Sequence, residues 1–116
     1  SPVRYVVADL LRLPDEWRHA YHLVIESITV QSLPTSLRQD AIHSVASLVA
    51  PGGTLLVLSR ILEPDADPED GPPWLLTRTQ IESFTQHGPH QTRIEQLPAA
   101  DPAAPGWWRA EFSRPS

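Results

Sequence analysis

Residues 21–61 decide the fold, and they read YHLVIESITV QSLPTSLRQD AIHSVASLVA PGGTLLVLSR I. This stretch opens with an apolar run, residues 21–30, and closes with another, residues 54–61. Short continuous apolar runs rich in β-branched residues are typical of the buried strands of an α/β sheet. Between the two runs, apolar residues recur at helical spacing, namely Leu37, Ala41, Val45, Leu48 and Val49. The stretch therefore predicts a strand, a helix and a second strand.

Capping signals predict where the helices begin and end. Residues 36–39 (SLRQ) fit a capping box, in which the first and last side chains bind free backbone N–H groups of the first turn. Residues 51–53 (PGG) are predicted to end this helix, because glycine adopts the left-handed conformation found after helices. A second capping box at residues 77–80 (TRTQ) predicts a short helix that ends at His87 and Gly88.

The flanking segments complete an α/β fold. Residues 3–8 (VRYVVA) predict a further parallel-type strand, and residues 14–20 have the leading proline of one or two helical turns. Residues 92–97 and 107–113 predict an antiparallel hairpin, because residues 98–106 are too few for a crossover helix. Trp108, Ala110 and Phe112 share one face of its second strand. We expect one domain over residues 1–116, with three parallel-type strands, flanking helices and a terminal antiparallel hairpin.

Composition and charge argue against several classes of function. The net charge is −5, from 14 acidic and 9 basic residues, and the basic residues are scattered, so we expect no nucleic-acid partner. No cysteine is present, and the histidines lack metal-ligand spacing, so we expect surface histidines and no metal. The sequence contains no basic leader and no apolar run of membrane-spanning length, so we expect a cytoplasmic protein without a membrane partner.

Candidate site residues follow the predicted parallel strands, because ligands of open α/β sheets bind beyond the carboxyl ends of these strands. Asp9 directly follows the first strand, where a carboxylate accepts hydrogen bonds from a ligand or caps a turn. Glu26 interrupts the second strand and is either exposed at the site or paired with an arginine inside; we favour the site. Gln31 lies beside it, as a ligand contact or a plain loop residue.

Three segments in this order resemble the second half of a class I S-adenosylmethionine-dependent methyltransferase. They are VVADLLRLP at residues 6–14, YHLVIESITVQSLP at residues 21–34 and LVAPGGTLLVL at residues 48–58. The segment GPPWLLTR at residues 71–78 further resembles the thiopurine methyltransferase-like branch. The expected fold is thus the carboxyl-terminal portion of a Rossmann-like methyltransferase sheet.

The resemblance also implies roles for individual residues. Asp9 and the backbone amide of Leu10 would bind the adenine of S-adenosylmethionine. Glu26 would lie near the methionine end and the transferred methyl group, which makes it the candidate catalytic residue and a cofactor contact. Pro73 and Trp74 would line the pocket of a small-molecule substrate, together with Gln31.

The glycine-rich strand and the ribose-binding acid that open this family's fold have no counterpart in the sequence. We therefore expect the chain to be part of a longer methyltransferase and to be inactive alone; the alternative is a non-catalytic Rossmann-like fragment that acts through protein association. Without those strands, residues 21–30 form an apolar sheet edge. This edge predicts self-association, unless residues 3–8 pair with residues 23–28 of the same chain.

Overall fold

The computed structural model describes residues 10–27, 30–62, 66–67, 69, 71 and 75–116. The predicted strand at residues 3–8 and the site candidates Asp9, Pro73 and Trp74 lie outside the described residues. None of the helices in the described ranges is long and apolar enough to cross a membrane.

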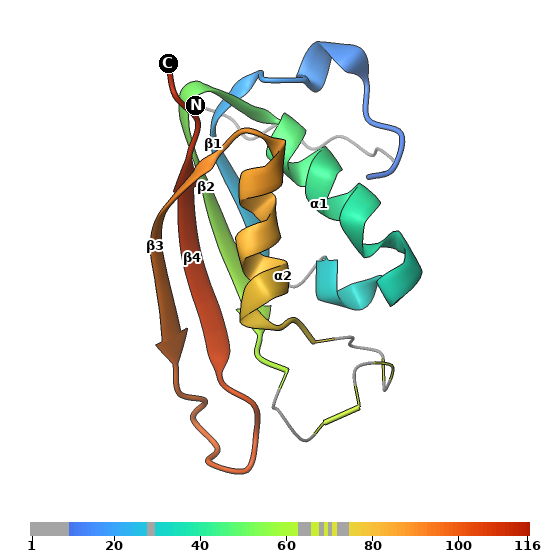
Figure 1. Ribbon diagram of the computed structural model, residues 1–116, viewed down its shortest axis with the longest axis vertical. Coiled ribbons are helices and arrows are strands. Elements are labelled where there is room, and N and C mark those ends of the chain that lie inside the picture. The colour runs from blue at the N-terminus through green and yellow to red at the C-terminus, as the bar shows by residue number, and fades with distance from the viewer. Residues whose placement is uncertain (1–9, 28–29, 63–65, 68, 70, 72–74) are drawn as a thin grey trace, which may run out of the picture.

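Four strands form one mixed sheet in the order β1-β2-β4-β3 (Figure 1). They are β1 (Tyr21–Ser27), β2 (Val49–Arg60), β3 (His90–Leu97) and β4 (Trp107–Ser113). β1 runs parallel to β2, whereas β4 is antiparallel to both of its neighbours. The predicted parallel pair and the terminal antiparallel hairpin are therefore confirmed, and β1 forms one edge of the described sheet.

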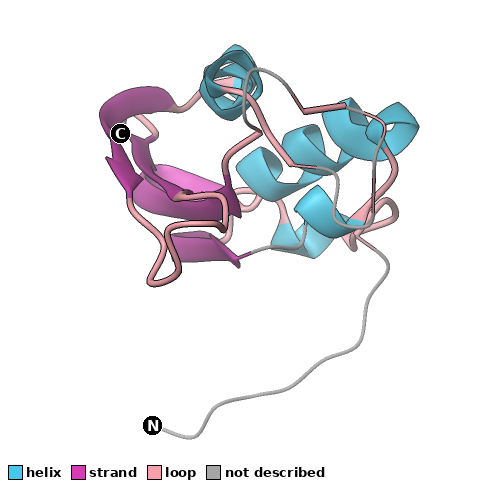
Figure 2. Cartoon of the chain, turned by 90° about the horizontal axis from the view of Figure 1, so that it is seen from below, coloured by secondary structure: helices cyan, strands magenta, loops and turns pink. Residues whose placement is uncertain are grey.

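The helices cover one face of this sheet (Figure 2). They are α1 (Arg38–Ser47), α2 (Arg78–Glu82) and the 3-10 helix η4 (Ser83–His87), and short 3-10 turns flank them at Asp15–Trp17 (η1), Val30–Ser32 (η2) and Thr35–Leu37 (η3). The hydrophobic core lies between the two layers and includes Ala41, Ile42, Val45, Leu55, Val57, Ile81, Phe84, Ala110 and Phe112. Trp108 is buried with Ala110 and Phe112, which confirms the shared face predicted for these residues.

Both predicted ends of α1 are wrong. Its N-cap is Leu37, with no side-chain cap, because the 3-10 turn η3 precedes the helix and already binds the Leu37 N–H to the Pro34 carbonyl (2.9 Å). Its last residue is Ser47, and residues 51–53 lie inside β2. Arg114 explains the early end, since its side chain donates to the carbonyls of Ala46 and Val49, both at 2.8 Å.

The second predicted capping box is confirmed at the start of α2. The Thr77 hydroxyl accepts from the Gln80 N–H (3.3 Å), and the Gln80 side chain accepts from the Thr77 N–H (2.9 Å). Both partners are local in the sequence, which is why the motif could be predicted. β1, by contrast, ends at Ser27 and not at residue 30, because η2 takes up the end of the apolar run.

The second face of the sheet differs between its two halves. On β1, Tyr21, Leu23 and Ile25 are 42%, 57% and 61% exposed. On β3 and β4 the same face carries charges, and Glu95 forms ion pairs with Arg93 and Arg109. The uncovered apolar surface is therefore concentrated along the β1 edge.

Candidate functional site

The candidate site lies where the parallel strands β1 and β2 end. Ser27, the last residue of β1, pairs with Leu58, so both strands end at the same edge of the sheet. Beyond this edge η2 follows β1, and the described residue Glu69 belongs to the chain between β2 and α2. We call this edge, with the side chains of Glu26, Gln31 and Arg60, the rim.

Glu26 is buried at the rim, with only 4% of its surface exposed. Its Oε1 accepts a hydrogen bond from the backbone N–H of Val30 (2.9 Å). The side chain therefore holds the turn from β1 into η2. Exposure of Glu26 at the site, one of the two arrangements expected from the sequence, is wrong, because the chain folds back over the side chain as η2. Its role near a transferred methyl group stays a prediction.

Gln31 connects the segment after β1 to the end of β2. It is 5% exposed, and its Oε1 accepts from the Ser59 hydroxyl (3.0 Å) and from the Arg60 N–H (2.7 Å). The sequence suggested a ligand contact or a plain loop residue, and neither interpretation includes this bridge. The amide oxygen is thus used inside the protein, and a contact of Gln31 with substrate stays a prediction.

Arg60 is a rim residue that the sequence did not indicate. Its Nη1 donates to the Pro105 carbonyl (2.6 Å), and its guanidinium lies 3.9 Å from the centre of the Trp107 ring. The Trp108 indole N–H donates to the Leu76 carbonyl (2.9 Å). The only local signal is a polar Ser-Arg pair that closes an apolar strand, and such a pair does not reveal partners in a distant hairpin.

Glu69, from the chain between β2 and α2, contacts the segment that follows β1. The Thr35 hydroxyl contacts both carboxylate oxygens of Glu69, at 2.9 and 3.0 Å. Arg38, at the start of α1, is buried, and burial lowers its pKa while the negative charge of Glu69 opposes this shift. The segments that follow β1 and β2 therefore meet through Thr35 and Glu69.

S-adenosylmethionine carries positive charge at its sulfonium and ammonium groups, and Glu26 places a buried carboxylate of the opposite charge at the end of β1. One oxygen of that carboxylate is bound to Val30, and Leu10 is half-buried against the hydrophobic core. Within the ranges that the structure describes, no group of three or more histidine or acidic residues is placed to hold a metal ion.

No protein-family model matches the sequence, and no curated protein matches it significantly. Solved structures match the fold over most of the chain. The [4+2]-cyclase SpnF is 15% identical with a TM-score of 0.75, and the match covers 95% of this chain and 55% of SpnF. The N-methyltransferase NodS from Bradyrhizobium japonicum WM9 is 19% identical with a TM-score of 0.69, covering 94% of this chain and 58% of NodS.

A third match includes a cofactor product. The 1,6-didemethyltoxoflavin-N1-methyltransferase of Burkholderia thailandensis, solved with 1,6-didemethyltoxoflavin and S-adenosylhomocysteine, is 8% identical with a TM-score of 0.75. The match covers 97% of this chain and 51% of that enzyme. The chain therefore has the Rossmann-like fold of the S-adenosylmethionine-dependent methyltransferases and spans about half the length of these structures. The thiopurine methyltransferase-like branch stays a prediction.

Proposed function

We propose that this chain is the carboxyl-terminal part of an S-adenosylmethionine-dependent enzyme that methylates a small molecule. The observation that carries this proposal is the strand order β1-β2-β4-β3, a parallel pair followed by an antiparallel hairpin, which superposes on two methyltransferases over 94% and 97% of the chain. The chain corresponds to only 58% and 51% of those enzymes. A preceding segment would supply the glycine-rich strand that has no counterpart in these 116 residues.

We assign the proposed roles to residues of the rim and of the neighbouring segments. Asp9 and the Leu10 amide hold the adenine, and Glu26 lies near the methyl group, while Gln31, Pro73 and Trp74 contact the acceptor. When bound, S-adenosylmethionine supplies a methyl group on a positively charged sulfur. Transfer of that group is an in-line displacement, so alignment and exclusion of water supply most of the acceleration. The bond from Val30 fixes the Glu26 carboxylate, which supports a positioning role for its charge.

A second candidate function is a non-catalytic module that acts through protein association. The exposed apolar side chains of Tyr21, Leu23 and Ile25 on an edge strand favour it. The name of SpnF, a [4+2]-cyclase, also shows that a shared fold does not fix the reaction. Both candidates predict contacts along β1, but only the enzyme predicts cofactor binding. A cytoplasmic location stays a prediction from the sequence.

Calorimetric titration with S-adenosylhomocysteine tests the proposal in two forms of the protein, the 116-residue chain and the full product of its gene. We expect binding by the longer form and none by the shorter one. Asp9→Ala in the longer form should weaken binding by about 1–3 kcal/mol, the loss of a buried polar contact, whereas Asp101→Ala in the exposed hairpin loop should not change it. If neither form binds S-adenosylhomocysteine, the proposal of an enzyme is wrong and the non-catalytic association module is the remaining candidate.

A further inference from the structure

A pocket with a strongly basic lining lies at the end of the sheet opposite the rim. Its volume is about 240 Å³, and it is lined by Arg18, His19, His43, Ser47, His87 and Arg114. Arg18 and His19 precede β1, His43 and Ser47 belong to α1, His87 ends η4, and Arg114 follows β4. We call it the basic pocket. None of its lining residues is acidic, although the protein as a whole has a net charge of −5.

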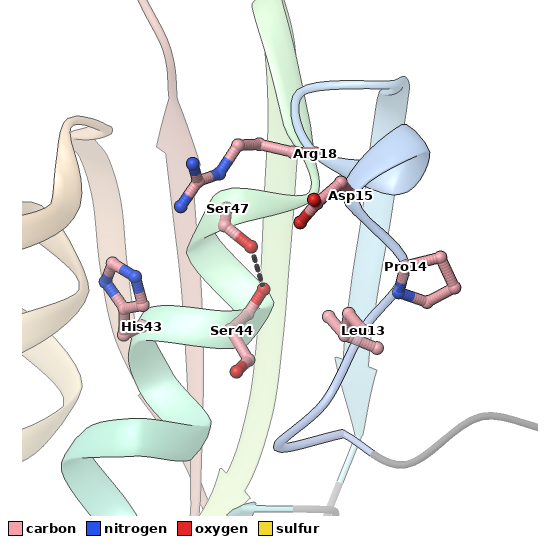
Figure 3. Close-up of a pocket in the computed structure, with 7 residues that line it drawn as sticks. All are labelled: Leu13, Pro14, Asp15, Arg18, His43, Ser44 and Ser47. Carbon is pink, nitrogen blue, oxygen red and sulfur yellow. Dashed lines mark hydrogen bonds between the residues drawn. The ribbon is translucent and has the colours of Figure 1, made fainter.

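A smaller hollow of about 120 Å³ adjoins the basic pocket and shares Arg18, His43 and Ser47 with it. Figure 3 shows the guanidinium of Arg18 extending past Ser47 toward the side on which His43 lies. The hydroxyl proton of Ser47 is already donated to the Ser44 carbonyl (2.6 Å), so Ser47 offers a ligand only its lone pairs. Asp15 lines the smaller hollow and is the only carboxylate among the described residues that line the two hollows.

Arg114 is fixed in the basic pocket by the backbone. Its Nε donates to the Val49 carbonyl (2.8 Å), and its Nη2 donates to the carbonyls of Ala46 (2.8 Å) and His87 (3.3 Å). Burial lowers its pKa, but a guanidinium stays charged at neutral pH. Among the described residues neither Arg114 nor Arg18 forms an ion pair, whereas Arg78, Arg93 and Arg109 do. Two cationic groups therefore line the cavity without a carboxylate of their own.

The two histidines of the pocket contact each other directly. The Nδ1 atoms of His43 and His87 lie 3.1 Å apart, so one ring must donate and the other accept. The His87 Nε2 is buried and has no hydrogen-bond partner within the described part of the chain. A buried polar atom without a partner is costly, so a hydrogen-bonding group that reached this nitrogen would stabilise the site.

The positively charged groups that line the basic pocket also repel one another. Burial and, secondarily, His43 lower the pKa of His87, and burial followed by Arg114 and Arg18 lowers the pKa of His19. A bound anion would remove this repulsion and supply acceptor atoms. The cavity has room for one, because about 10–15 Å³ on the same scale already holds a water molecule and this cavity measures about 240 Å³.

We propose that the basic pocket binds a tetrahedral oxyanion, either free phosphate or the phosphate group of a phosphorylated ligand. Arg18 and Arg114 supply the charge, and the ring of the His43–His87 pair that accepts through Nδ1 supplies its Nε2–H as a hydrogen-bond donor. The site is distinct from the rim and lies at the amino ends of the parallel strands. It does not depend on methyl transfer, because no rim residue lines it.

Sulfate is the probe for the test because its charge does not change between pH 5.5 and 7.5. We expect saturable NMR shifts of the His43 and His87 imidazoles on titration with sulfate at constant ionic strength, with chloride as the control. Arg18→Ala should weaken sulfate binding about tenfold, because one charge-assisted contact is lost. Arg78→Ala, an exposed arginine of α2, is the matched control and should not change it.

The pH dependence provides a second readout. Burial lowers the pKa of both His19 and His87, and protonation of these rings at low pH adds charge to that of Arg18 and Arg114, beside the Asp15 carboxyl group of the adjoining hollow. Sulfate affinity should therefore fall at least threefold as the pH rises from 5.5 to 7.5. Inorganic phosphate and adenosine monophosphate, compared at one pH, distinguish the two sources: equal affinities indicate the free ion, and tighter binding of the nucleotide indicates a phosphorylated ligand. Shifts that do not saturate, or unchanged binding in Arg18→Ala, would overturn the proposal.

Discussion

Glu26 and Gln31 each use a side-chain oxygen to accept a hydrogen bond from a backbone N–H group. These two rim residues therefore also stabilise the structure of the rim. Glu26 binds the first residue of η2, and Gln31 binds the last residue of β2. The Val30 N–H opens a 3-10 turn and the Arg60 N–H lies at the end of a strand, and a side-chain oxygen satisfies each of them. A substitution at either position therefore has a structural and a functional consequence, which can be separated by the choice of replacement.

For Gln31 the structural consequence dominates. Gln31→Ala leaves the buried Ser59 hydroxyl and the Arg60 N–H without their acceptor. The expected loss in the free energy of unfolding is about 1–3 kcal/mol. Urea unfolding measures it, and Gln39→Ala on the exposed side of α1 is the matched control, with an expected change within about 0.5 kcal/mol. Equal effects of the two substitutions would show that the bridge contributes nothing.

For Glu26 the replacement by glutamine isolates the charge. Glu26→Gln retains an oxygen that can accept from the Val30 N–H, so we expect the variant to fold. In the whole enzyme we expect turnover to fall more than cofactor affinity, because the proposed role of the charge is near the transferred methyl group. Steady-state kinetics and calorimetry on the same preparation measure the two quantities. Unchanged turnover would remove Glu26 from the catalytic machinery.

Among the helices and strands, the sequence predicts those features that depend on contacts between neighbouring residues. The capping box of α2 and the hairpin of β3 and β4 rest on neighbouring residues, and the sequence predicts both. The end of α1 rests on Arg114, whose side chain reaches its last turn from beyond β4, and the sequence does not predict it. The basic pocket likewise combines residues of four separate segments, so no sequence pattern marks it, and the expectation of surface histidines is wrong for His87, which is half-buried.

Arg114 holds the end of α1 against the start of β2, and this contact can be tested directly. Arg114→Ala removes the charged donor of three backbone carbonyls. Because hydrogen bonds from charged groups are the strong ones, we expect a loss of about 2–3 kcal/mol in the free energy of unfolding. Arg109→Ala on the exposed face of β4 removes only a surface ion pair and should cost about 0–1 kcal/mol. A loss for Arg114→Ala as small as this would contradict its role as a cap.

For the whole molecule, the main feature is a sheet that the described helices cover on one face only (Figure 2). Its second face exposes Tyr21, Leu23 and Ile25 along β1, the edge strand. This seven-residue strand carries neither lysine nor proline, the residues that usually protect a sheet edge. The arrangement fits a molecule whose β1 edge is completed by further protein.

We expect the 116-residue chain to self-associate through this edge. Sedimentation equilibrium at micromolar concentration should give a dimer or a larger species, because pairing of two β1 edges buries the apolar side chains and satisfies the free backbone groups. Ile25→Lys should shift the population toward monomer, whereas Thr92→Lys on the exposed surface of β3 should leave it unchanged. A stable monomer would indicate that residues 3–8 or another part of the same chain covers the edge.

In the proposed enzyme the end of β1 forms the methyl end of an S-adenosylmethionine site, and photochemical labelling can locate that site in the sequence. The full gene product is irradiated with S-adenosylmethionine tritiated in its methyl group, with and without excess S-adenosylhomocysteine, and then cleaved after arginine. Arg18 and Arg38 bound the diagnostic peptide, residues 19–38, which contains Glu26 and Gln31. We expect label in this peptide, and we expect excess S-adenosylhomocysteine to displace it. Displaceable label found elsewhere in the protein but never in residues 19–38 would contradict this expectation.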